Sequence, residues 1–397
     1  MPIYLDHAAT TPMLPSVITA YVSALGLVGN PSSIHSQGQQ AKRMLEEARE
    51  RVAGSLGADS VEVTFTSGGT EAINLAIKGL FWARNPAGRV GGAAVVSRPR
   101  ILVARAEHHA TIDAVQWLEE HEGALIDWIP VSATGLIDLE YVAAALADDV
   151  ALVTALWANN EVGTVQPIAA LVALAEAHGV PVHCDAVSAY GHVPLDFRAT
   201  GLAALSVSAH KVGGPVGIGA LVIARSATVT PLIHGGNQQR ARSGTQDAAG
   251  AVAFGEAASL IERRRDRAPD TALRDHLIAG IRAAVPDAVL RGDPVDRLAN
   301  NVHFTYPGCE GDSLLFLLDV AGFSVSTGSA CQAGVPEASH VLLAMGVPEA
   351  DARGALRMTL GPDTTLAELD ALAAALPAAV TRARAAGLAD RTPRLGH

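Results

Sequence analysis

Cysteine is scarce in this chain, which has three thiols, at Cys184, Cys309 and Cys331, in 397 residues. Three scattered cysteines are too few for a disulfide framework or a CxxC metal site, so we expect reduced thiols and no metal ion. Positive charge is also in the minority: 29 Lys and Arg stand against 40 Asp and Glu, and the formal net charge is −11. Direct binding of nucleic acid is therefore disfavoured.

Long apolar runs and aromatic side chains are lacking as well. No uninterrupted apolar stretch is long enough to span a membrane, and the amino terminus does not pair a basic segment with an apolar one. We therefore expect a soluble, cytoplasmic protein without a membrane partner. Aromatic residues make up only 4% of the chain, whereas Ala, Val, Leu and Gly dominate it. This composition is typical of helices packed closely on a buried parallel sheet.

Short segments rich in β-branched residues alternate with helical patterns in the first half of the chain. The expected strands are 61–66, 101–104, 151–156, 181–185, 204–208 and 218–223, and the expected helices are 37–57, 70–82, 109–120 and 167–179. Alternation at this spacing requires crossover connections and predicts an α/β fold with a mostly parallel sheet. Ligands of such sheets bind at the carboxyl ends of the strands.

The spacing changes after a long helix expected from about residue 250 to Arg265. Beyond Pro286, strands and helices recur in a different rhythm, which indicates a second, smaller α+β domain. We expect a large domain over 15–255, a small domain formed by 1–14 together with 256–385, and a mobile tail over 386–397.

A glycine pair joins one predicted strand to the helix that follows it, in the run FTSGGTE from Phe65 to Glu71. The glycines permit a tight turn, the helix start presents free N–H groups, and Thr70 adds a hydroxyl, so the segment suits a phosphate. An ordinary glycine-rich turn fits the pattern equally well. The run is neither a Walker A motif nor a GxGxxG fingerprint.

An acidic residue, Asp185, ends another predicted strand, with His183 on the same face and Cys184 on the other. A carboxylate at the mouth of a parallel sheet needs a cationic partner, and a protonated pyridinium nitrogen would be one. A metal ion held by His183 and Asp185 is the rival interpretation, for which no third ligand is in sight. Cys184 is expected to be a small core residue.

Other candidate residues have equally ordinary explanations. His108 follows a strand and is suited to lie over an aromatic cofactor, but it is also suited to cap a helix. Asn160 closes the next strand, where a turn is the plainer interpretation. Lys211, between His210 and two glycines, is suited to form an imine, although exposed lysines are commoner. Cys331 lies among Ser, Gly and Ala, which favours a reactive thiol over a packed one.

Together these residues resemble the class V pyridoxal-phosphate enzymes of aminotransferase fold, and within them the cysteine desulfurases of the NifS and IscS type. The resemblance runs from YLDHAATTP at Tyr4, through RSGT at Arg242, to LRMTLG at Leu356. The segment around Cys331 looks like the longer-looped desulfurase group. The resemblance implies a fold-type I enzyme that uses pyridoxal 5'-phosphate.

The resemblance also implies roles for individual residues. Lys211 would form the imine with the cofactor, Asp185 would pair with the pyridinium nitrogen, and His108 would stack on the ring and move protons. Cys331 would take the sulfur of L-cysteine as a persulfide, leaving L-alanine. The remaining cofactor and substrate contacts would come from Gly69, Thr70, Ser208 and His210 at the phosphate, Thr245 of a second subunit of a homodimer, Asn160 and Ser188 at the phenolic oxygen, and Arg357 with Asn30 at the substrate carboxylate.

Two segments depart from the family pattern. Ser188 stands where a glutamine is usual, and its side chain is shorter by about two bonds. The run from His234 to Arg240 looks one residue short and has Gln239 in place of a glutamate. Both changes spare the lysine, the aspartate and the cysteine.

Three functions stay open on these grounds. The first is a cysteine desulfurase that passes sulfur to an acceptor protein, such as a cluster scaffold or a thiolation enzyme. The second is a C–S lyase or aminotransferase that uses Lys211 and Asp185 without a protein thiol. The third is a binding scaffold without activity, which the presence of Lys211 disfavours.

Overall fold

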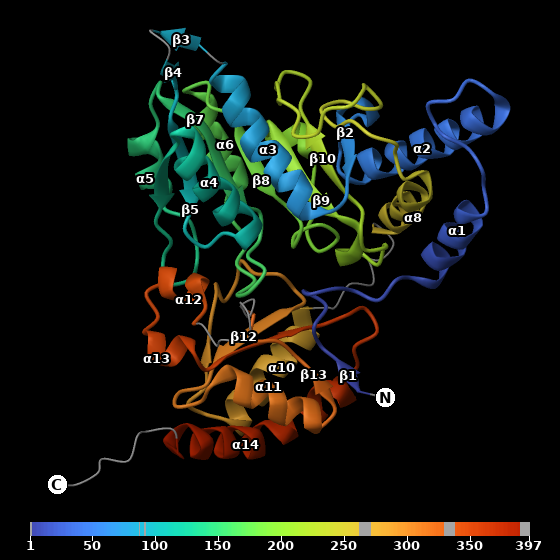
Figure 1. Ribbon diagram of the computed structural model, residues 1–397. Coiled ribbons are helices and arrows are strands. Elements are labelled where there is room, and N and C mark those ends of the chain that lie inside the picture. Colours follow the sequence, from blue (N-terminus) through green and yellow to red (C-terminus); the bar gives the residue numbers. More distant parts are fainter. Residues whose placement is uncertain (1, 87, 91–92, 262–270, 329–337, 390–397) are drawn as a thin grey trace.

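The computed structural model describes residues 2–86, 88–90, 93–261, 271–328 and 338–389. Cys331 therefore lies outside the described residues, as does the end of the chain from 390 onward. Two bodies lie one above the other, with the amino-terminal strand beside the smaller one (Figure 1).

A seven-stranded sheet forms the centre of the larger body, in the order β2-β10-β9-β8-β7-β5-β6. Only β10 runs antiparallel to its neighbours, so the expectation of an α/β fold with a mostly parallel sheet is confirmed. The strands are β2 (Val63–Thr66), β5 (Arg100–Ala104), β6 (Leu125–Ile129), β7 (Val150–Leu156), β8 (Val182–Asp185), β9 (Ala204–Ser208) and β10 (Gly219–Ile223).

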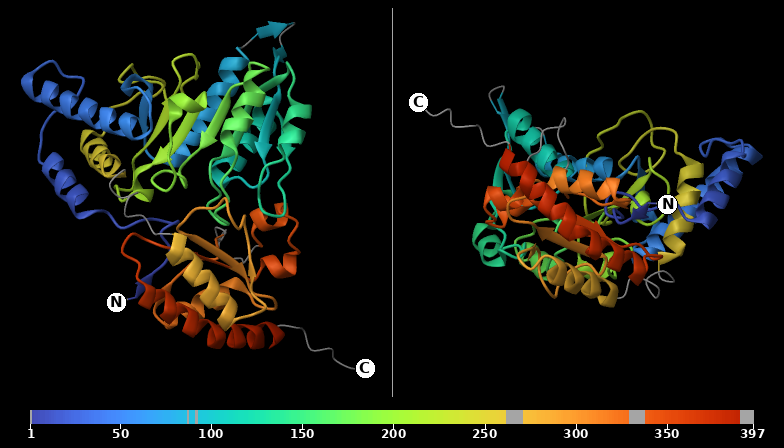
Figure 2. Two further views of the ribbon diagram at one scale, coloured as in Figure 1. Left: turned by 180° about the vertical axis from the view of Figure 1, so that it is seen from behind. Right: turned by 90° about the horizontal axis from the view of Figure 1, so that it is seen from below.

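Helices cover both faces of this sheet, which explains the continuous apolar runs of its strands (Figure 2). Successive side chains of β5 point to opposite faces: Leu102 packs in one apolar cluster, and Ile101 and Val103 pack in another. The helices are α1 (Pro15–Leu25), α2 (Ser36–Ser55), α3 (Gly69–Arg84), α4 (His109–Glu122), α5 (Leu139–Ala145), α6 (Ile168–Glu176), α7 (Phe197–Thr200) and α8 (Ala248–Ser259). A short hairpin, β3 (Gly88–Val90) with β4 (Ala93–Val95), lies at the far end.

The smaller body has its own core, in which Leu5 packs with side chains from residues 277–383. Its strands are β1 (Ile3–Tyr4), β11 (Val289–Leu290), β12 (Asn301–Thr305), β13 (Phe323–Ser324) and β14 (Ala355–Thr359). Its helices are α10 (Thr271–Ala284), α11 (Gly311–Val320), α12 (His340–Ala344), α13 (Glu349–Ala352) and α14 (Leu366–Ala389). Because β1 pairs with β13, the amino terminus belongs structurally with the end of the chain.

The structure differs from the expected boundaries at the last helix. Helix α14 continues to Ala389, so residues 386–389 are helical, where a mobile tail was expected to begin at 386. Its Ala- and Leu-rich sequence propagates the helix past the point where apolar periodicity fades. Helix α8 ends at Ser259, and residues 262–265 of the expected helix lie outside the described residues. The division into two domains near residue 255 stays a proposal.

Within the described part of the chain, no helix is both long enough and apolar enough to cross a membrane.

Candidate active site

Polar side chains from five strand-to-helix connections meet at one edge of the sheet. The connections follow β2, β5, β7, β8 and β9, and these strands share one direction, so their carboxyl ends lie together. There they border a cavity of about 400 Å³ between the two bodies. Its walls are formed by Ala8, Ala9, Gly69, Thr70, Ile73, His108, Leu156, Asn160, Asp185, Val187, Ser188, Ser208, His210, Lys211, Ser326, Gly328 and Arg357.

A second cavity of about 710 Å³ lies at the opposite edge, beside the start of β8 and β9. Its arginines are already engaged: Arg198 and Arg225 pair with Asp59, and Arg84 donates to the carbonyl oxygen of Gly179. Although this cavity is larger, its arginines are engaged in these contacts, so we place the candidate active site in the smaller cavity.

Lys211 follows β9 and points its amine toward the amino-terminal segment. Nζ donates hydrogen bonds to the carbonyl oxygens of Ala8 and Ala9, the latter at 3.0 Å. Burial and the nearby Arg357 charge lower the pKa of Lys211 to about 8, although Asp185 works in the opposite direction. A substantial fraction of the amine is therefore neutral near physiological pH, as a nucleophilic lysine requires.

Asp185 ends β8 with only 2% of its surface exposed. Its Oδ1 accepts a hydrogen bond of 2.8 Å from the Val187 N–H. Burial raises the pKa of Asp185 to about 6, while that hydrogen bond and the Lys211 charge hold it lower than burial alone would. A cation in the cavity beside Asp185 would favour its ionised form.

Glu107 lies behind Asp185 and was not singled out from the sequence. It is 1% exposed, and its Oε1 accepts a hydrogen bond of 2.7 Å from the Leu156 N–H. Burial and the neighbouring Asp185 raise the pKa of Glu107 to about 8. At neutral pH this carboxyl group is mostly protonated, so it adds little negative charge beside Asp185.

His108 caps the start of α4 and also faces the cavity. Its Nδ1 accepts a hydrogen bond of 3.1 Å from the Ala110 N–H, which leaves Nε2 to carry the proton of the neutral ring. Loss of hydration and the Lys211 charge lower the pKa of His108 to about 4. The helix-cap interpretation is therefore confirmed, and the neutral ring also lies in the cavity wall, where its stacking on an aromatic cofactor stays a prediction.

The end of the cavity that suits a phosphate is formed by the start of α3 and the end of β9. A β-carbon at Gly69 would lie 2.8 Å from Cγ2 of Val187, so the backbone there approaches its neighbour closely. The buried Ser208 hydroxyl has no hydrogen-bond partner among the described residues. His210 contacts Thr10 at 3.3 Å, and burial with the Lys211 charge lowers the pKa of His210 to about 4.

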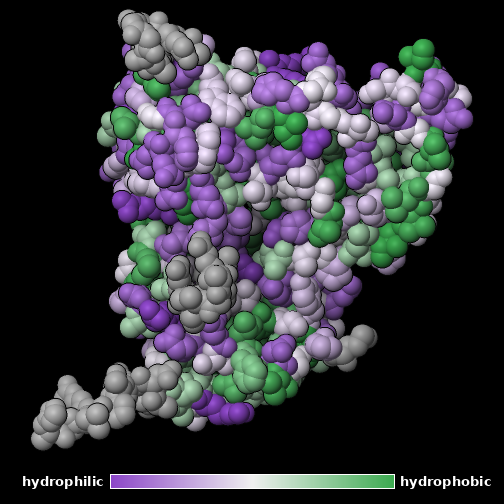
Figure 3. Space-filling view, in the orientation of Figure 1, coloured by the Kyte–Doolittle hydropathy of each residue, from purple (hydrophilic) through white to green (hydrophobic). Residues whose placement is uncertain are grey.

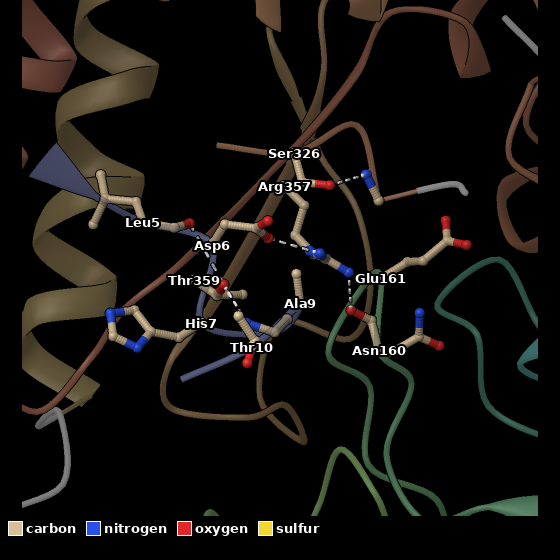
Figure 4. A network of polar contacts seen from close by, with 12 residues as sticks. Leu5, Asp6, His7, Ala9, Thr10, Asn160, Glu161, Ser326, Arg357 and Thr359 are labelled. Atoms are coloured by element: carbon tan, nitrogen blue, oxygen red, sulfur yellow. Dashed lines mark hydrogen bonds and ion pairs between the residues drawn. The ribbon is translucent and has the colours of Figure 1, made fainter. Parts of the chain in front are cut away.

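The smaller body contributes Arg357, on β14, to the wall of the cavity. Its Nη2 pairs with Oδ1 of Asp6 at 2.9 Å, and its Nη1 donates to the carbonyl oxygen of Asn160 at 2.9 Å (Figure 4). Nε and the amide oxygen of Asn160 have no partner among the described residues. Asp6 was not assigned a role from the sequence, although it stands inside the motif at Tyr4.

Two expected site residues that the structure describes, Thr245 and Asn30, are not in this wall. Thr245 is exposed on the segment before α8, and Asn30 is exposed near the end of α1, where its side-chain oxygen accepts from the Ser32 N–H at 2.9 Å. Cys331 lies outside the described residues. Within one chain, Thr245 and Asn30 are therefore not brought to the cavity, and the roles expected for them stay predictions.

The alternative of a metal pair at His183 finds no support in the geometry. His183 is fully buried, and its two ring nitrogens lie 2.9 Å from the hydroxyls of Thr154 and Ser206. Burial lowers its pKa to about 3. In the described part of the chain, no three His, Cys, Asp or Glu side chains gather as metal ligands do.

Gln239, one of the departures from the family pattern, supports the edge strand β2. Its side-chain oxygen accepts from the Phe65 N–H at 3.0 Å, and its side-chain nitrogen donates to the Phe65 carbonyl at 2.7 Å. The amide thus satisfies a donor and an acceptor of the same residue, which a carboxylate cannot do. The other departure, Ser188, lies in the cavity wall as expected.

Comparison with known proteins agrees with this geometry. The family model for class-V aminotransferases matches residues 3–372. An IscS-like cysteine desulfurase of Mycobacterium tuberculosis is 51% identical over 97% of this chain and 98% of its own length. A cysteine desulfurase IscS of Dictyoglomus turgidum is 41% identical over 93% of this chain and 92% of its own length.

Solved structures are similar over the same extent. A NifS-like protein superposes with a TM-score of 0.87 at 30% identity, over 96% of this chain and 100% of that one. SspA in complex with cysteine superposes with a TM-score of 0.77 at 31% identity, over 91% of this chain and 100% of that one. The chain therefore belongs to the class-V aminotransferase family.

Proposed function

We propose that this protein is a pyridoxal-phosphate-dependent cysteine desulfurase. L-cysteine and the thiol of Cys331 give L-alanine and a persulfide on Cys331. The C–S bond of cysteine breaks, an S–S bond forms, and the proton of the Cys331 thiol is balanced by the hydrogen gained at the β-carbon of alanine. The observation that carries the proposal is the meeting of Lys211, Asp185, His108 and Arg357 at one cavity in a chain similar to cysteine desulfurases over nearly its whole length.

The cavity residues fit pyridoxal 5'-phosphate. An unpartnered Ser208 hydroxyl and the start of α3 at Gly69 and Thr70 suit a phosphate, with His210 beside them. The unpartnered amide oxygen of Asn160 and the Ser188 hydroxyl would hold the phenolic side of the ring. When bound, the cofactor supplies an electron sink for carbanion chemistry at the amino acid.

The protein's own residues supply the remaining requirements. The lowered pKa of Lys211 makes its amine available as a nucleophile and as a base. Neutral His108 holds a proton on Nε2, opposite the nitrogen that caps α4. Arg357, already fixed by Asp6, presents a planar fork that suits the carboxylate of cysteine.

The decisive experiment measures the products that purified protein forms from L-cysteine. We expect alanine together with a persulfide on Cys331, identified by mass spectrometry after labelling. Cys331→Ala should retain the cofactor but lose alanine formation by several orders of magnitude, as removal of a nucleophile generally does. Cys184→Ala is the matched control, because Cys184 is a fully buried core residue.

Three outcomes would contradict this assignment. Pyruvate and sulfide formed by Cys331→Ala at the wild-type rate would favour the C–S lyase, and a demand for an amino acceptor would favour the aminotransferase. Wild-type protein that binds the cofactor and leaves cysteine unchanged, both with and without an amino acceptor, would exclude all three activities.

A homodimer is part of the proposal. One face of α1 and the segment after it expose large apolar side chains, which gather on one flank of the molecule (Figure 3). These are Ile18 (47% exposed), Val22 (63%), Leu25 (61%), Leu27 (47%), Val28 (86%) and Ile34 (91%). Exposed apolar side chains gathered in this way suit a second subunit, whose Thr245 would then complete the phosphate site.

Sedimentation tests the dimer directly. Val22→Asp should shift the protein toward monomer and weaken cofactor binding, whereas an active wild-type monomer at working concentration would contradict the proposal.

The sulfur acceptor is proposed to be a protein that takes the persulfide sulfur, either a cluster scaffold or a thiolation enzyme. A cytoplasmic location stays a prediction.

A further inference from the structure

The segment that carries Cys331 joins the described structure at two places close to the same buried carboxylate. Gly328 is the last described residue before Cys331, and Ala338 is the first after it. Glu161, in the connection after β7, is only 2% exposed. Its Oε2 accepts a hydrogen bond of 2.5 Å from the hydroxyl of Ser339. A β-carbon built on Gly328 would lie 3.5 Å from that same Oε2.

The backbone that carries Glu161 is held rigidly. The Asn159 side-chain oxygen accepts from the N–H groups of Glu161 and Val162, both at 2.9 Å, while its nitrogen donates to the carbonyl of Ala106 at 2.9 Å. Asn301 on β12 donates to the Glu161 carbonyl at 3.0 Å. Glu161 is therefore a fixed point between the two bodies, and Asn160 is its immediate neighbour.

The residues around each junction also bond to the active site. Ser326 forms a backbone bridge with Arg357, with N···O distances of 2.6 and 3.1 Å, and its hydroxyl accepts from the Gly328 N–H at 3.1 Å (Figure 4). On the other side, Nε2 of His340 contacts the carbonyl of Glu107 at 2.8 Å. The residues on either side of the Cys331 segment thus contact Arg357 directly. They also contact Glu161 and Glu107, which precede or follow Asn160 and His108 in the sequence.

His303 lies against the same point without supplying a counter-charge. It is fully buried, and a β-carbon on Gly328 would lie 3.4 Å from its Nε2. Burial and the Arg357 charge lower the pKa of His303 to about 3, so its ring is neutral. A buried carboxylate needs hydrogen-bond donors, and the Ser339 hydroxyl is the side-chain donor that the described residues provide to Glu161.

We propose that Glu161 is a positioning residue for sulfur transfer, which fastens the Ser339 end of the Cys331 segment to the turn that carries Asn160 and lies beside the Gly328 end. The proposal rests on the proposed desulfurase function and deepens it. A thiol must meet the substrate sulfur within contact distance, and a misplacement of about 1 Å can cost on the order of 100-fold in rate. Loss of the anchor should therefore affect the sulfur-transfer step and spare cofactor and cysteine binding.

The test compares Glu161→Ala, Glu161→Gln, Ser339→Ala and the double variant Glu161→Ala with Ser339→Ala. Glu161→Ala should lower kcat for alanine formation by about 10- to 100-fold, with cofactor content and KM for cysteine near wild type. Glu161→Gln should lose less, because an amide oxygen still accepts from the Ser339 hydroxyl. The double variant should be no slower than Glu161→Ala alone, because both changes remove one interaction.

A second readout needs no turnover. Iodoacetamide labelling, followed peptide by peptide, should modify Cys331 several times faster in Glu161→Ala than in wild type, with buried Cys184 and Cys309 as internal references. Glu62→Gln is the matched control: Glu62 is also a buried carboxylate, 8% exposed, but it lies in the wall of the other cavity, so alanine formation should not change.

Wild-type alanine turnover by cofactor-loaded Glu161→Ala would overturn the inference, as would losses that multiply in the double variant. If Glu161→Ala does not fold, Glu161→Gln and Ser339→Ala decide, and wild-type rates with wild-type Cys331 labelling in both would overturn it equally. Wild-type protein that makes no alanine would instead refute the proposed function, so the two failures are distinguishable.

Discussion

The lowered pKa of Lys211 predicts how covalent capture of the cofactor depends on pH. Burial and Arg357 bring the pKa from 10.5 to about 8. At pH 7.5, an amine with the ordinary pKa is neutral in about one molecule per thousand, whereas an amine with a pKa of about 8 is neutral in about one in four. The folded site therefore presents roughly 200-fold more of the nucleophilic form.

Substitutions of the two charged neighbours of Lys211 should shift its pKa in opposite directions. Asp185 raises the pKa of Lys211, so Asp185→Asn should lower it further and move the capture midpoint to lower pH. Arg357 lowers the pKa of Lys211, so Arg357→Gln should move the midpoint to higher pH. Burial, the larger cause, is unchanged in both variants, so each midpoint should stay well below 10.5.

The assay mixes cofactor-free protein with pyridoxal 5'-phosphate between pH 7 and 10, stops the reaction with borohydride and measures the added mass on each lysine. The chain has only two other lysines, Lys42 and Lys78, which serve as internal references. Capture by Lys211 should rise with pH and level off above about 8. A capture rate that keeps rising tenfold per pH unit through pH 9.5, or variants that shift in the same direction, would refute the reasoning.

Three further predictions concern the proposed cofactor site. Ser188→Gln should shift the pKa of the cofactor imine by about one unit or less, the effect of one hydrogen bond of about 0.5–1.5 kcal/mol, and superimposable spectral titrations would show that Ser188 does not contact the ring. Thr245→Ala should weaken cofactor binding without dissociating the dimer, and unchanged affinity would remove Thr245 from the shared site. Gly69→Ala should weaken cofactor binding several-fold and cost about 1–3 kcal/mol in stability, because its methyl would lie 2.8 Å from Val187 Cγ2. Gly54→Ala is the control for thermal unfolding: it meets nothing within 4 Å and should be neutral or stabilising.

The buried strands and the residues at their ends could be predicted from the sequence. The strand β9 lies at the expected residues 204–208, because every residue of a strand covered on both faces is apolar or small. Lys211 and Asp185 could be named because they stand at the carboxyl ends of such strands, where parallel direction alone brings them together.

Partners from distant parts of the chain could not be predicted. Asp6 and Arg357 are 351 residues apart in sequence, and they meet because an isolated bridge pairs Asp6 with Thr359 at the end of β14. Glu107 stands next to His108, yet its side chain is buried close to Asp185, and no periodicity in the four-residue connection between β5 and α4 shows that direction. Glu161 likewise stands next to a candidate residue, Asn160, and the sequence does not show that its side chain is buried.

The titratable groups of the cavity also distinguish functional from structural burial. Glu71, near the end of the cavity that suits a phosphate, is half-buried, and burial alone would raise its pKa. Hydrogen bonds from Arg242 and Ser67 outweigh that effect and hold the pKa of Glu71 below its ordinary value, as a structural ion pair does. At Lys211 and Asp185 the balance is reversed, because burial outweighs the partner and brings both pKa values toward neutrality. Two groups with pKa values close to 7 in one cavity cost stability in the protein without its cofactor, and each can gain or lose a proton near physiological pH, as acid–base chemistry requires.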